Sequence, residues 1–246
     1  MQIKEYVKMH NSEESFFWYV ARRKIIEKVI KNNINLENKE NLKVLEIGCG
    51  TGGNLVYFSK IFPKIQGVEC CEKAITFAKQ KTKIKMQTGK LPDDLPFKKE
   101  KFDIIFMFDV LEHIEEENKT LKKIHQILNE QGKLIITVPA FKLLWSNHDT
   151  RNQHYRRYTK GMLKQSLIKG GFKINYSNYF NFLLFLPIFI TRMLDKGKSK
   201  HEENNDIKNY NKITNNLLRL IMESEKYLMK YLRFPWGVSV ISIAQK

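Results

Sequence analysis

Cysteine is scarce in this sequence, with three residues in a chain of 246. Cys70 and Cys71 are adjacent and Cys49 lies in a glycine-rich stretch, so their spacing does not fit a zinc site. The first ten residues lack the apolar segment and the small-residue cleavage site of a secretory signal. Both absences favour a protein of the reducing cytoplasm.

Acidic residues are also few: 26 Asp and Glu stand against 43 Lys and Arg, a formal net charge of +17. This excess is compatible with a nucleic acid or an anionic membrane as partner. The lysines are dispersed, however, and Lys, Asn and Ile are abundant throughout, which is typical of a compositional bias. Charge alone therefore identifies no partner. The length and a hydrophobic fraction of 42% predict one α/β domain, residues 1–246, with insertions.

A short apolar run over residues 42–47 predicts a strand buried on both faces, and it ends abruptly in glycine. The loop that follows contains Gly48, Gly50, Gly52 and Gly53. Because glycine has no Cβ, the backbone can turn sharply here and let a ligand approach closely before a helix starts near Asn54. The sequence therefore predicts a binding loop at this strand end.

The glycine spacing alone is also compatible with a dinucleotide loop. Glu46 distinguishes better between a dinucleotide and other ligands, because a carboxylate at this strand end would repel a pyrophosphate and attract a cationic group. The pattern E-x-G-x-G-x-G from Glu46 resembles motif I of the class I S-adenosylmethionine (SAM) dependent methyltransferases. This resemblance implies that the amino acid portion of SAM lies against Glu46 and the loop residues Gly48, Cys49, Gly50 and Gly52.

A second acidic residue, Glu69, ends the next predicted strand about 20 residues after the loop. Doubly wound folds place there the acid that accepts hydrogen bonds from ribose hydroxyls. Glu69, with its neighbour Cys70, is therefore predicted to bind the ribose, although an acidic helix cap is the alternative. In the methyltransferase family an aspartate often contacts the adenine, but this chain has Lys90 at that point. Adenine would then be held by backbone groups and Leu91, or by Asp93 or Asp94.

Residues 102–109 predict a fourth strand, and the V-L-E-H-I that follows resembles the corresponding motif of the same family. The resemblance places Phe108 and Asp109, at the carboxyl edge of the sheet, near the methionine part of SAM. His113 could act as a base, but a structural role is favoured because it lies at the entrance to a helix. The sequence predicts no metal site.

Residues 140–159 are rich in groups that transfer protons or bind anions, and they follow the carboxyl end of a fifth strand. The segments L-W-S-x-H-D and H-Y-R-R-Y resemble a type 11/12-like branch of uncharacterised methyltransferases associated with envelope glycan, lipid or natural-product pathways. The resemblance makes this stretch the substrate loop. The loop residues predicted to contact the acceptor are Trp145, Tyr155 and Arg156.

A hydroxyl acceptor would need a base, and His154 or a His148 and Asp149 pair are the candidates; an amine would need none. Arg156 would bind an acidic group of the acceptor. Arg157 could do the same or brace the loop against a carboxylate.

The first 35 residues are predicted to form a helical lid, with a helix over about 13–30 that is capped by Asn11 or Ser12. Its aromatic start suggests burial on more than one side. Trp18, Arg22 and Arg23 are predicted either to contact ligands, with Trp18 and Arg23 on the substrate, or simply to pack.

A second insertion is predicted over residues 180–234. Its intensely apolar start, 180–190, is too short to span a bilayer and contains Pro187. Through residues 180–192 it could contact a membrane surface, cover a lipid-like acceptor or form a dimer seam, but a core helix is slightly favoured. Residues 196–216 are predicted to be an exposed connection. An amphipathic helix and a last strand, 238–244, follow.

Together these features predict a Rossmann-like, doubly wound sheet of seven strands, mostly parallel with an antiparallel last strand, and helices on both faces. The predicted function is transfer of the SAM methyl group to an O or N atom of a small-molecule, glycan-linked or lipid-linked acceptor. The alternatives are an RNA methyltransferase, although no N-P-P-Y-like motif is present, and a non-catalytic SAM-binding scaffold. A nicotinamide enzyme is opposed by Glu46.

Overall fold

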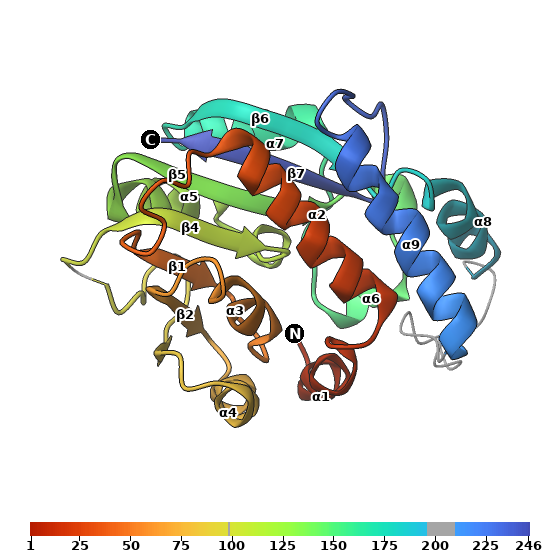
Figure 1. Cartoon of the computed structure of the whole chain (residues 1–246), viewed down its shortest axis with the longest axis horizontal. Coiled ribbons are helices and arrows are strands. Elements are labelled where there is room, and N and C mark those ends of the chain that lie inside the picture. The colour runs from red at the N-terminus through yellow and green to blue at the C-terminus, as the bar shows by residue number, and fades with distance from the viewer. Residues whose placement is uncertain (98, 196–209) are drawn as a thin grey trace.

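A computed structural model describes residues 1–97, 99–195 and 210–246. A sheet of seven strands, in the order β3-β2-β1-β4-β5-β7-β6, crosses the molecule (Figure 1). Of the seven described strands, β7 alone runs in the opposite direction to the other six. The predicted fold class is confirmed. The strands are β1 (Val44–Ile47), β2 (Ile65–Glu69), β3 (Met86–Thr88), β4 (Phe102–Phe108), β5 (Leu128–Pro139), β6 (Lys173–Phe180) and β7 (Ser239–Gln245).

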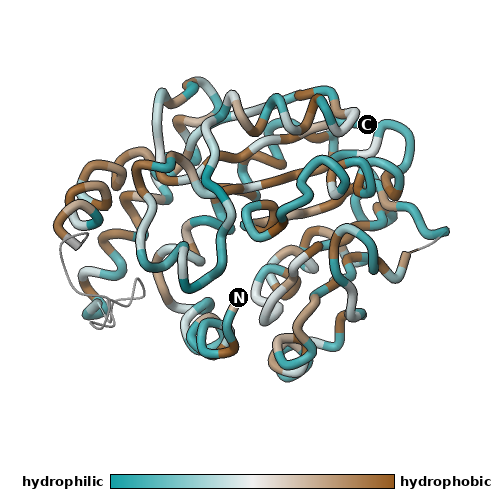
Figure 2. The backbone as a smooth tube through the Cα atoms, turned by 180° about the vertical axis from the view of Figure 1, so that it is seen from behind, coloured by the Kyte–Doolittle hydropathy of each residue, from teal (hydrophilic) through white to brown (hydrophobic). Residues whose placement is uncertain are grey.

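Helices cover both faces of the sheet. The long helices α2 and α9 pack against each other in front of it in Figure 1, and α5 and α7 cover the opposite face, which Figure 2 brings forward. The helices are α1 (Ile3–Ser12), α2 (Phe17–Asn33), α3 (Gly53–Phe58), α4 (Glu72–Lys81), α5 (Glu117–Ile127), α6 (Asn147–Arg151), α7 (Lys160–Lys169), α8 (Phe185–Asp195) and α9 (Lys212–Leu228), with short 3-10 turns η1 (Leu111–His113) and η2 (Lys142–Leu144).

The strand order positions the site. β1 and β4 lie side by side in the middle of the sheet, and both are buried almost throughout because helices cover both faces. The strand order reverses between them, and in open α/β sheets ligands bind at such a switch point, beyond the carboxyl ends of the strands. The glycine loop follows β1, and Asp109 follows β4 at this edge.

The N-terminal segment differs from the expectation. Instead of one helix over about 13–30, it forms α1 and α2, separated by a turn at residues 13–16. Ser12 ends α1 rather than capping the next helix, and its hydroxyl donates to the Lys8 carbonyl at 2.7 Å. The chain breaks here because Glu13 is bonded to the glycine loop, a contact that no local sequence pattern reveals.

The second insertion forms α8 and α9. Part of the expected exposed connection, residues 196–209, lies outside the described residues, and the prediction was wrong for residues 212–216, which belong to α9. The base of the apolar stretch is core, with Phe180 and Leu184 buried, but α8 itself exposes Leu186 and Ile190. Among the described residues, no helix combines the length and apolar character that crossing a bilayer requires.

Candidate functional site at the carboxyl edge

The loop after β1 adopts the left-handed backbone conformations that its glycines permit. Gly48, Gly50 and Gly52 all have positive φ, at 71°, 53° and 87°. A Cβ on Gly48 would lie 2.4 Å from a methyl of Val110, so the segment after β4 packs directly on this loop. The loop and the residues that follow β4 therefore form one continuous surface.

Glu46 lies at the end of β1 and is fully buried. Its Oε1 accepts a hydrogen bond from Asn54 Nδ2 at 2.9 Å, whereas Oε2 has no partner among the described residues. Burial raises the pKa of this carboxyl to about 8, an effect that the Asn54 contact only partly offsets. A buried acceptor without a donor is costly, so the site is suited to a ligand that brings a cationic N–H group.

Glu69 ends β2 and faces the same loop. Its Oε2 accepts from the Gly50 backbone N–H at 3.0 Å. Its Oε1 accepts from the Tyr6 hydroxyl at 2.9 Å and from the Cys71 backbone N–H at 3.0 Å. Burial first, and the Glu69 carboxylate second, raise the pKa of Tyr6. A hydroxyl from α1 thus already donates to the carboxylate predicted to receive the ribose hydroxyls.

α1 and the turn after it lie on the glycine loop. The Glu13 carboxylate accepts from the Thr51 hydroxyl at 2.6 Å and from the Gly53 N–H at 3.2 Å, and it also pairs with Lys81. Met9 is equally close, since a Cβ on Gly50 would lie 3.2 Å from its sulfur. None of these α1 contacts was predicted, because each joins segments about 40 or more residues apart.

The two residues of α2 predicted to contact the substrate, Trp18 and Arg23, lie on different sides of the site. Arg23 is buried beside the glycine loop, where its Nη2 donates to the Glu13 carbonyl at 2.5 Å and its guanidinium lies 5.7 Å from the Tyr57 ring. Trp18 instead stacks on Phe180 at the end of β6, with ring centroids 6.4 Å apart. Arg23 is therefore on the loop side of the site, and Trp18 is on the side of the second insertion.

Asp109 and Phe108 are held by α2. Arg22 forms an ion pair with Asp109 at 3.0 Å and lies 5.7 Å above the Phe108 ring. The Thr137 hydroxyl donates to Asp109 at 2.9 Å. Asp109 also has a positive φ of 53°, a conformation that a non-glycine residue rarely adopts and that often marks a functional site. Arg22 thus closes the methionine side of the predicted cofactor site.

Asp149 is the centre of the 140–159 loop and is fully buried. Arg157 binds both its oxygens, at 2.7 and 2.9 Å, and His154 Nδ1 lies 2.8 Å from Oδ1. The Ser146 N–H also donates to it, at 2.8 Å. Burial opposes ionisation, but the hydrogen bonds from His154 and Arg157 outweigh it and hold the pKa of Asp149 well below its usual range. Arg157 therefore braces the loop.

Asp149 pairs with His154, whereas His148, the histidine of the predicted pair, has a different neighbour. His148 Nε2 instead lies 3.0 Å from Asn152 Nδ2, and its ring centroid is 6.1 Å from that of His154. The reason is the local helix: α6 carries His148 and Asp149 on different sides, and the chain then turns back so that His154 meets the carboxylate.

The remaining predicted contacts of the loop lie nearer the surface. Arg156 donates to the Glu115 backbone carbonyl at 2.9 Å and pairs with the Glu117 carboxylate at 3.0 Å, so both groups already occupy its guanidinium. Tyr155 is 53% exposed, and the half-buried Trp145 reaches Thr150 at 3.4 Å. At the adenine side, Leu91 packs on the core, and Asp93 pairs with Lys119 at 2.9 Å.

The structure also brings together three residues from η1 and the loop: Glu112, His113 and His154. One potential ligand atom from each lies within 4.8 Å of the others. Glu112 is fully buried, and neither carboxylate oxygen has a hydrogen-bond partner among the described residues. Burial raises the pKa of Glu112 well above its ordinary value and lowers the pKa of His113 to about 3. The V-L-E-H-I pattern was the sequence signal for this cluster, but His154 could not be joined to it from sequence.

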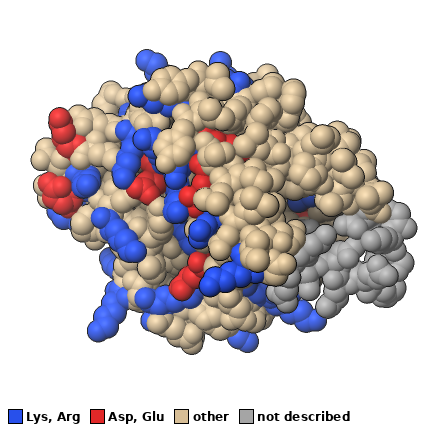
Figure 3. Space-filling model, turned by 45° about the vertical axis from the view of Figure 1, so that its right-hand side comes forward, with Lys and Arg blue, Asp and Glu red and all other residues tan. Residues whose placement is uncertain are grey.

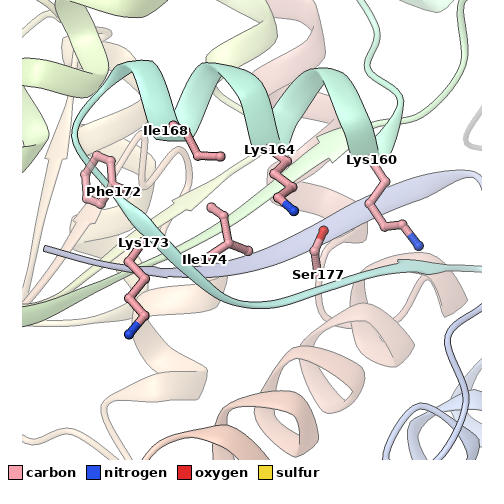
Figure 4. Close-up of a pocket in the computed structure, with 7 residues that line it drawn as sticks. All are labelled: Lys160, Lys164, Ile168, Phe172, Lys173, Ile174 and Ser177. Atoms are coloured by element: carbon pink, nitrogen blue, oxygen red, sulfur yellow. The ribbon is translucent and has the colours of Figure 1, made fainter.

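A separate open groove of about 460 Å³ lies between α7 and β6 (Figure 4). Lysines and apolar side chains line it: Lys160, Lys164, Ile168, Phe172, Lys173, Ile174 and Ser177. It contains none of the groups gathered beyond β1, β2 and β4, so it is not part of the site described above.

The sheet order, the glycine loop and the two acidic strand ends are those of a class I SAM-dependent methyltransferase fold. The methyltransferase domain family matches residues 17–176, and the chain belongs to this family. SAM is the cofactor of this class.

Several known proteins are similar to this chain in sequence. An uncharacterized protein of Methanocaldococcus jannaschii is 30% identical over 173 residues, 66% of this chain and 71% of that protein. Phosphoethanolamine N-methyltransferase of Plasmodium falciparum is 27% identical over 51% of this chain, and a ubiquinone biosynthesis O-methyltransferase of Pelagibacter ubique is 28% identical over 46%. The chain spans about half the length of these two enzymes, 50% of each.

Among solved structures, a SAM dependent methyltransferase from Archaeoglobus fulgidus has the same fold. Its TM-score is 0.57 at 18% identity, over 98% of this chain and 99% of that one.

The residues present fit SAM. The unpartnered Oε2 of Glu46 provides the acceptor that an ammonium group requires, and Glu69 provides the carboxylate for sugar hydroxyls. The close approach of Met9 to Gly50 shows that a side chain lies where this glycine leaves room for a ligand.

Proposed function

We propose that the protein transfers the SAM methyl group to an oxygen or nitrogen atom of a small-molecule, glycan-linked or lipid-linked acceptor. The observation that carries this proposal is the Asp149 and His154 pair, 2.8 Å apart, in the loop beyond β5 at the same sheet edge as Glu46 and Glu69. Cofactor groups and a proton-transfer group thus share one edge.

Most of the rate would come from positioning. Bound SAM supplies an activated methyl group on sulfur, which is already a good leaving group. In this proposal Glu46 holds the cofactor ammonium and Glu69 holds the ribose, while Arg22 fixes Asp109 and Phe108 on the methionine side. The chain itself would form no covalent bond to the substrate.

His154 is the residue that would act on an acceptor hydroxyl. Asp149 fixes its Nδ1, and a carboxylate in this position selects one tautomer and orients the ring, leaving Nε2 for the reaction. Histidine is the side chain best suited to exchange a proton near neutral pH. An amine acceptor would need only the positioning.

The acceptor is proposed to be lipid-linked because an apolar surface adjoins the acceptor loop. α8 exposes Leu186 and Ile190, and α9 exposes Leu217 and Leu220. Both helices lie at the same end of the molecule, where Figure 3 shows a broad area without charged side chains. Arg192 of α8 donates to the carbonyl of Leu144 in the loop, which joins this surface to the site.

The proposal is tested by incubating the protein with labelled SAM and three acceptor pools: membrane lipid extract in anionic vesicles, soluble metabolites and glycans, and total RNA. We expect label in the lipid pool. Leu186→Ser/Ile190→Ser should reduce this labelling several-fold and leave SAM binding unchanged, because only the apolar contact is lost. The control Ile168→Ser, at an exposed position of α7 on the opposite face of the sheet, should behave as wild type. Label confined to RNA, or to no pool, would contradict the proposed function.

The proposal includes α1 as a lid. Tyr6 and Glu13 hold groups of the cofactor site in the structure, so we propose that α1 moves away when SAM enters. Tyr6→Phe removes the hydroxyl that competes for Glu69. A hydrogen bond to a charged group contributes about 1.5–3 kcal/mol, so SAM affinity should rise by about 10- to 150-fold.

Calorimetric titration of SAM measures this change, and the exposed Tyr155→Phe is the matched control. Weaker binding by Tyr6→Phe would contradict competition and would mean that the tyrosine contacts bound cofactor.

A further inference from the structure

We propose that Glu112, His113 and His154 bind a divalent transition-metal ion beside the cofactor site. Their potential ligand atoms lie within 4.8 Å of one another, and they come from two segments, η1 and the 140–159 loop. The Tyr155 N–H donates to the Glu112 carbonyl at 2.8 Å and holds the two segments together. The cluster is therefore built into the fold rather than formed by loose surface side chains.

Glu112 supplies the strongest argument. It is fully buried, and both carboxylate oxygens lack a hydrogen-bond partner among the described residues. Leaving a buried carboxylate unsatisfied is costly, and proteins ordinarily pair such groups or use them to coordinate metals. The nearby guanidinium groups do not serve it, because Arg22 binds Asp109 and Arg157 binds Asp149. A bound cation would satisfy Glu112.

Each histidine is already held through one side of its ring. His154 Nδ1 lies 2.8 Å from Asp149, and the His113 ring is hydrogen-bonded to the Asn152 backbone. The two rings meet edge to face with centroids 4.5 Å apart. Metal-binding histidines typically have such outer partners, which fix the tautomer and leave the other nitrogen for the ion.

The ligand chemistry defines the class of ion. Two imidazoles and one carboxylate suit Zn²⁺ or Fe²⁺ and leave further coordination positions open, as in catalytic sites. In a tetrahedral site with bonds of about 2.1 Å, the ligand atoms on one Zn²⁺ ion lie about 3.4 Å apart. The side chains would therefore close by up to about 1.4 Å around the ion.

The ion would lie next to the cofactor loop, since Val110, two residues before Glu112, packs on Gly48. The role of the ion rests on the proposed function. It would bind the acceptor hydroxyl and lower the pKa of that hydroxyl. His154 would then be a ligand of the ion, so the hydroxyl proton would pass to solvent water instead of to His154 as the acceptor oxygen takes the methyl group from sulfur.

Metal binding is tested without SAM or acceptor. Zn²⁺ is titrated calorimetrically into chelator-treated protein, and Co²⁺ is added in parallel because its visible absorption reports nitrogen ligands. We expect one ion per chain and an affinity that falls at least tenfold in Glu112→Gln and in His154→Asn. The control His125→Asn changes a histidine that packs on Phe172 and should bind as wild type. Thermal denaturation of each variant verifies folding. Zn²⁺ should raise the melting temperature of the wild type and of the control, which bind the ion, more than that of the two site variants.

Absence of Zn²⁺ and Co²⁺ binding by the wild type would overturn the metal site. If the folded double variant Glu112→Gln/His154→Asn bound Zn²⁺ as tightly as the wild type, the metal site would also be overturned. Binding that follows the expected pattern, together with no methyl transfer to any acceptor, would support the site and reject the proposed function, so the two failures are distinguishable.

Discussion

Glu69→Ala is expected to reduce SAM affinity at least 100-fold. Its carboxylate can accept two hydrogen bonds from ribose hydroxyls, and each bond to a charged group contributes about 1.5–3 kcal/mol. The same side chain receives the Gly50 and Cys71 N–H groups, so its loss also loosens the loop that the cofactor approaches. Both effects lower the affinity for SAM.

Calorimetric titration of SAM and of S-adenosylhomocysteine into wild type and variant measures the effect. Glu69→Gln keeps the size of the side chain. Its SAM affinity should lie between those of wild type and Glu69→Ala, because the neutral amide oxygen accepts hydrogen bonds only weakly. Glu72→Ala, which changes an exposed acid in the first turn of α4, is the control. Binding by Glu69→Ala within threefold of wild type would remove this residue from the cofactor site.

Asp149→Ala is expected to have the largest effect on stability, lowering the free energy of unfolding by about 3–5 kcal/mol. The change leaves Arg157 buried, with the Ala140 carbonyl at 3.0 Å as its remaining described acceptor. It also releases His154 and the Ser146 N–H. An uncompensated buried charge is more damaging than loss of the whole pair, so Asp149→Ala/Arg157→Met should be more stable than Asp149→Ala alone.

Urea denaturation of the three proteins measures these differences. Asp93→Ala, which breaks an exposed ion pair with Lys119, should lower the stability far less than Asp149→Ala and serves as the control. A cost for Asp149→Ala no greater than that of Asp93→Ala would show that the buried cluster does not hold the loop.

The stabilisation by Asp149 should depend on pH in a defined direction. Its pKa is lower in the folded protein than its ordinary value of about 3.9. Its contribution is therefore fully present above about pH 4 and is lost as the pH falls towards the folded-state pKa. The stability difference between wild type and Asp149→Ala should narrow below about pH 4.

Local sequence patterns were sufficient for the sheet and for the acidic strand ends. The strands that end at Ile47 and Glu69 are short, apolar and followed by loop residues, so their carboxyl ends could be predicted to meet at one edge. The glycines at positions 48, 50 and 52 have the positive φ values that only their residue type adopts easily. These features depend on neighbours in sequence.

Contacts between distant segments could not be predicted. Tyr6 meets Glu69 across 63 positions, and Glu13 meets Gly53 across 40, so the helix start expected near residue 13 was wrong. His154 was a candidate base from its surroundings in sequence, but its approach to Glu112 and His113 depends on how the loop turns back on η1. Long-range packing decided each of these cases.

The position of β7 has a consequence for biosynthesis. Residues 239–245 form the strand between β5 and β6, and they pair with both along their length. While these residues are still inside the ribosomal tunnel, the facing edges of β5 and β6 have no partner, and β6 is not joined to the other five strands. The last stage of folding must therefore follow translation of residue 245, and until then both open edges can pair with other chains.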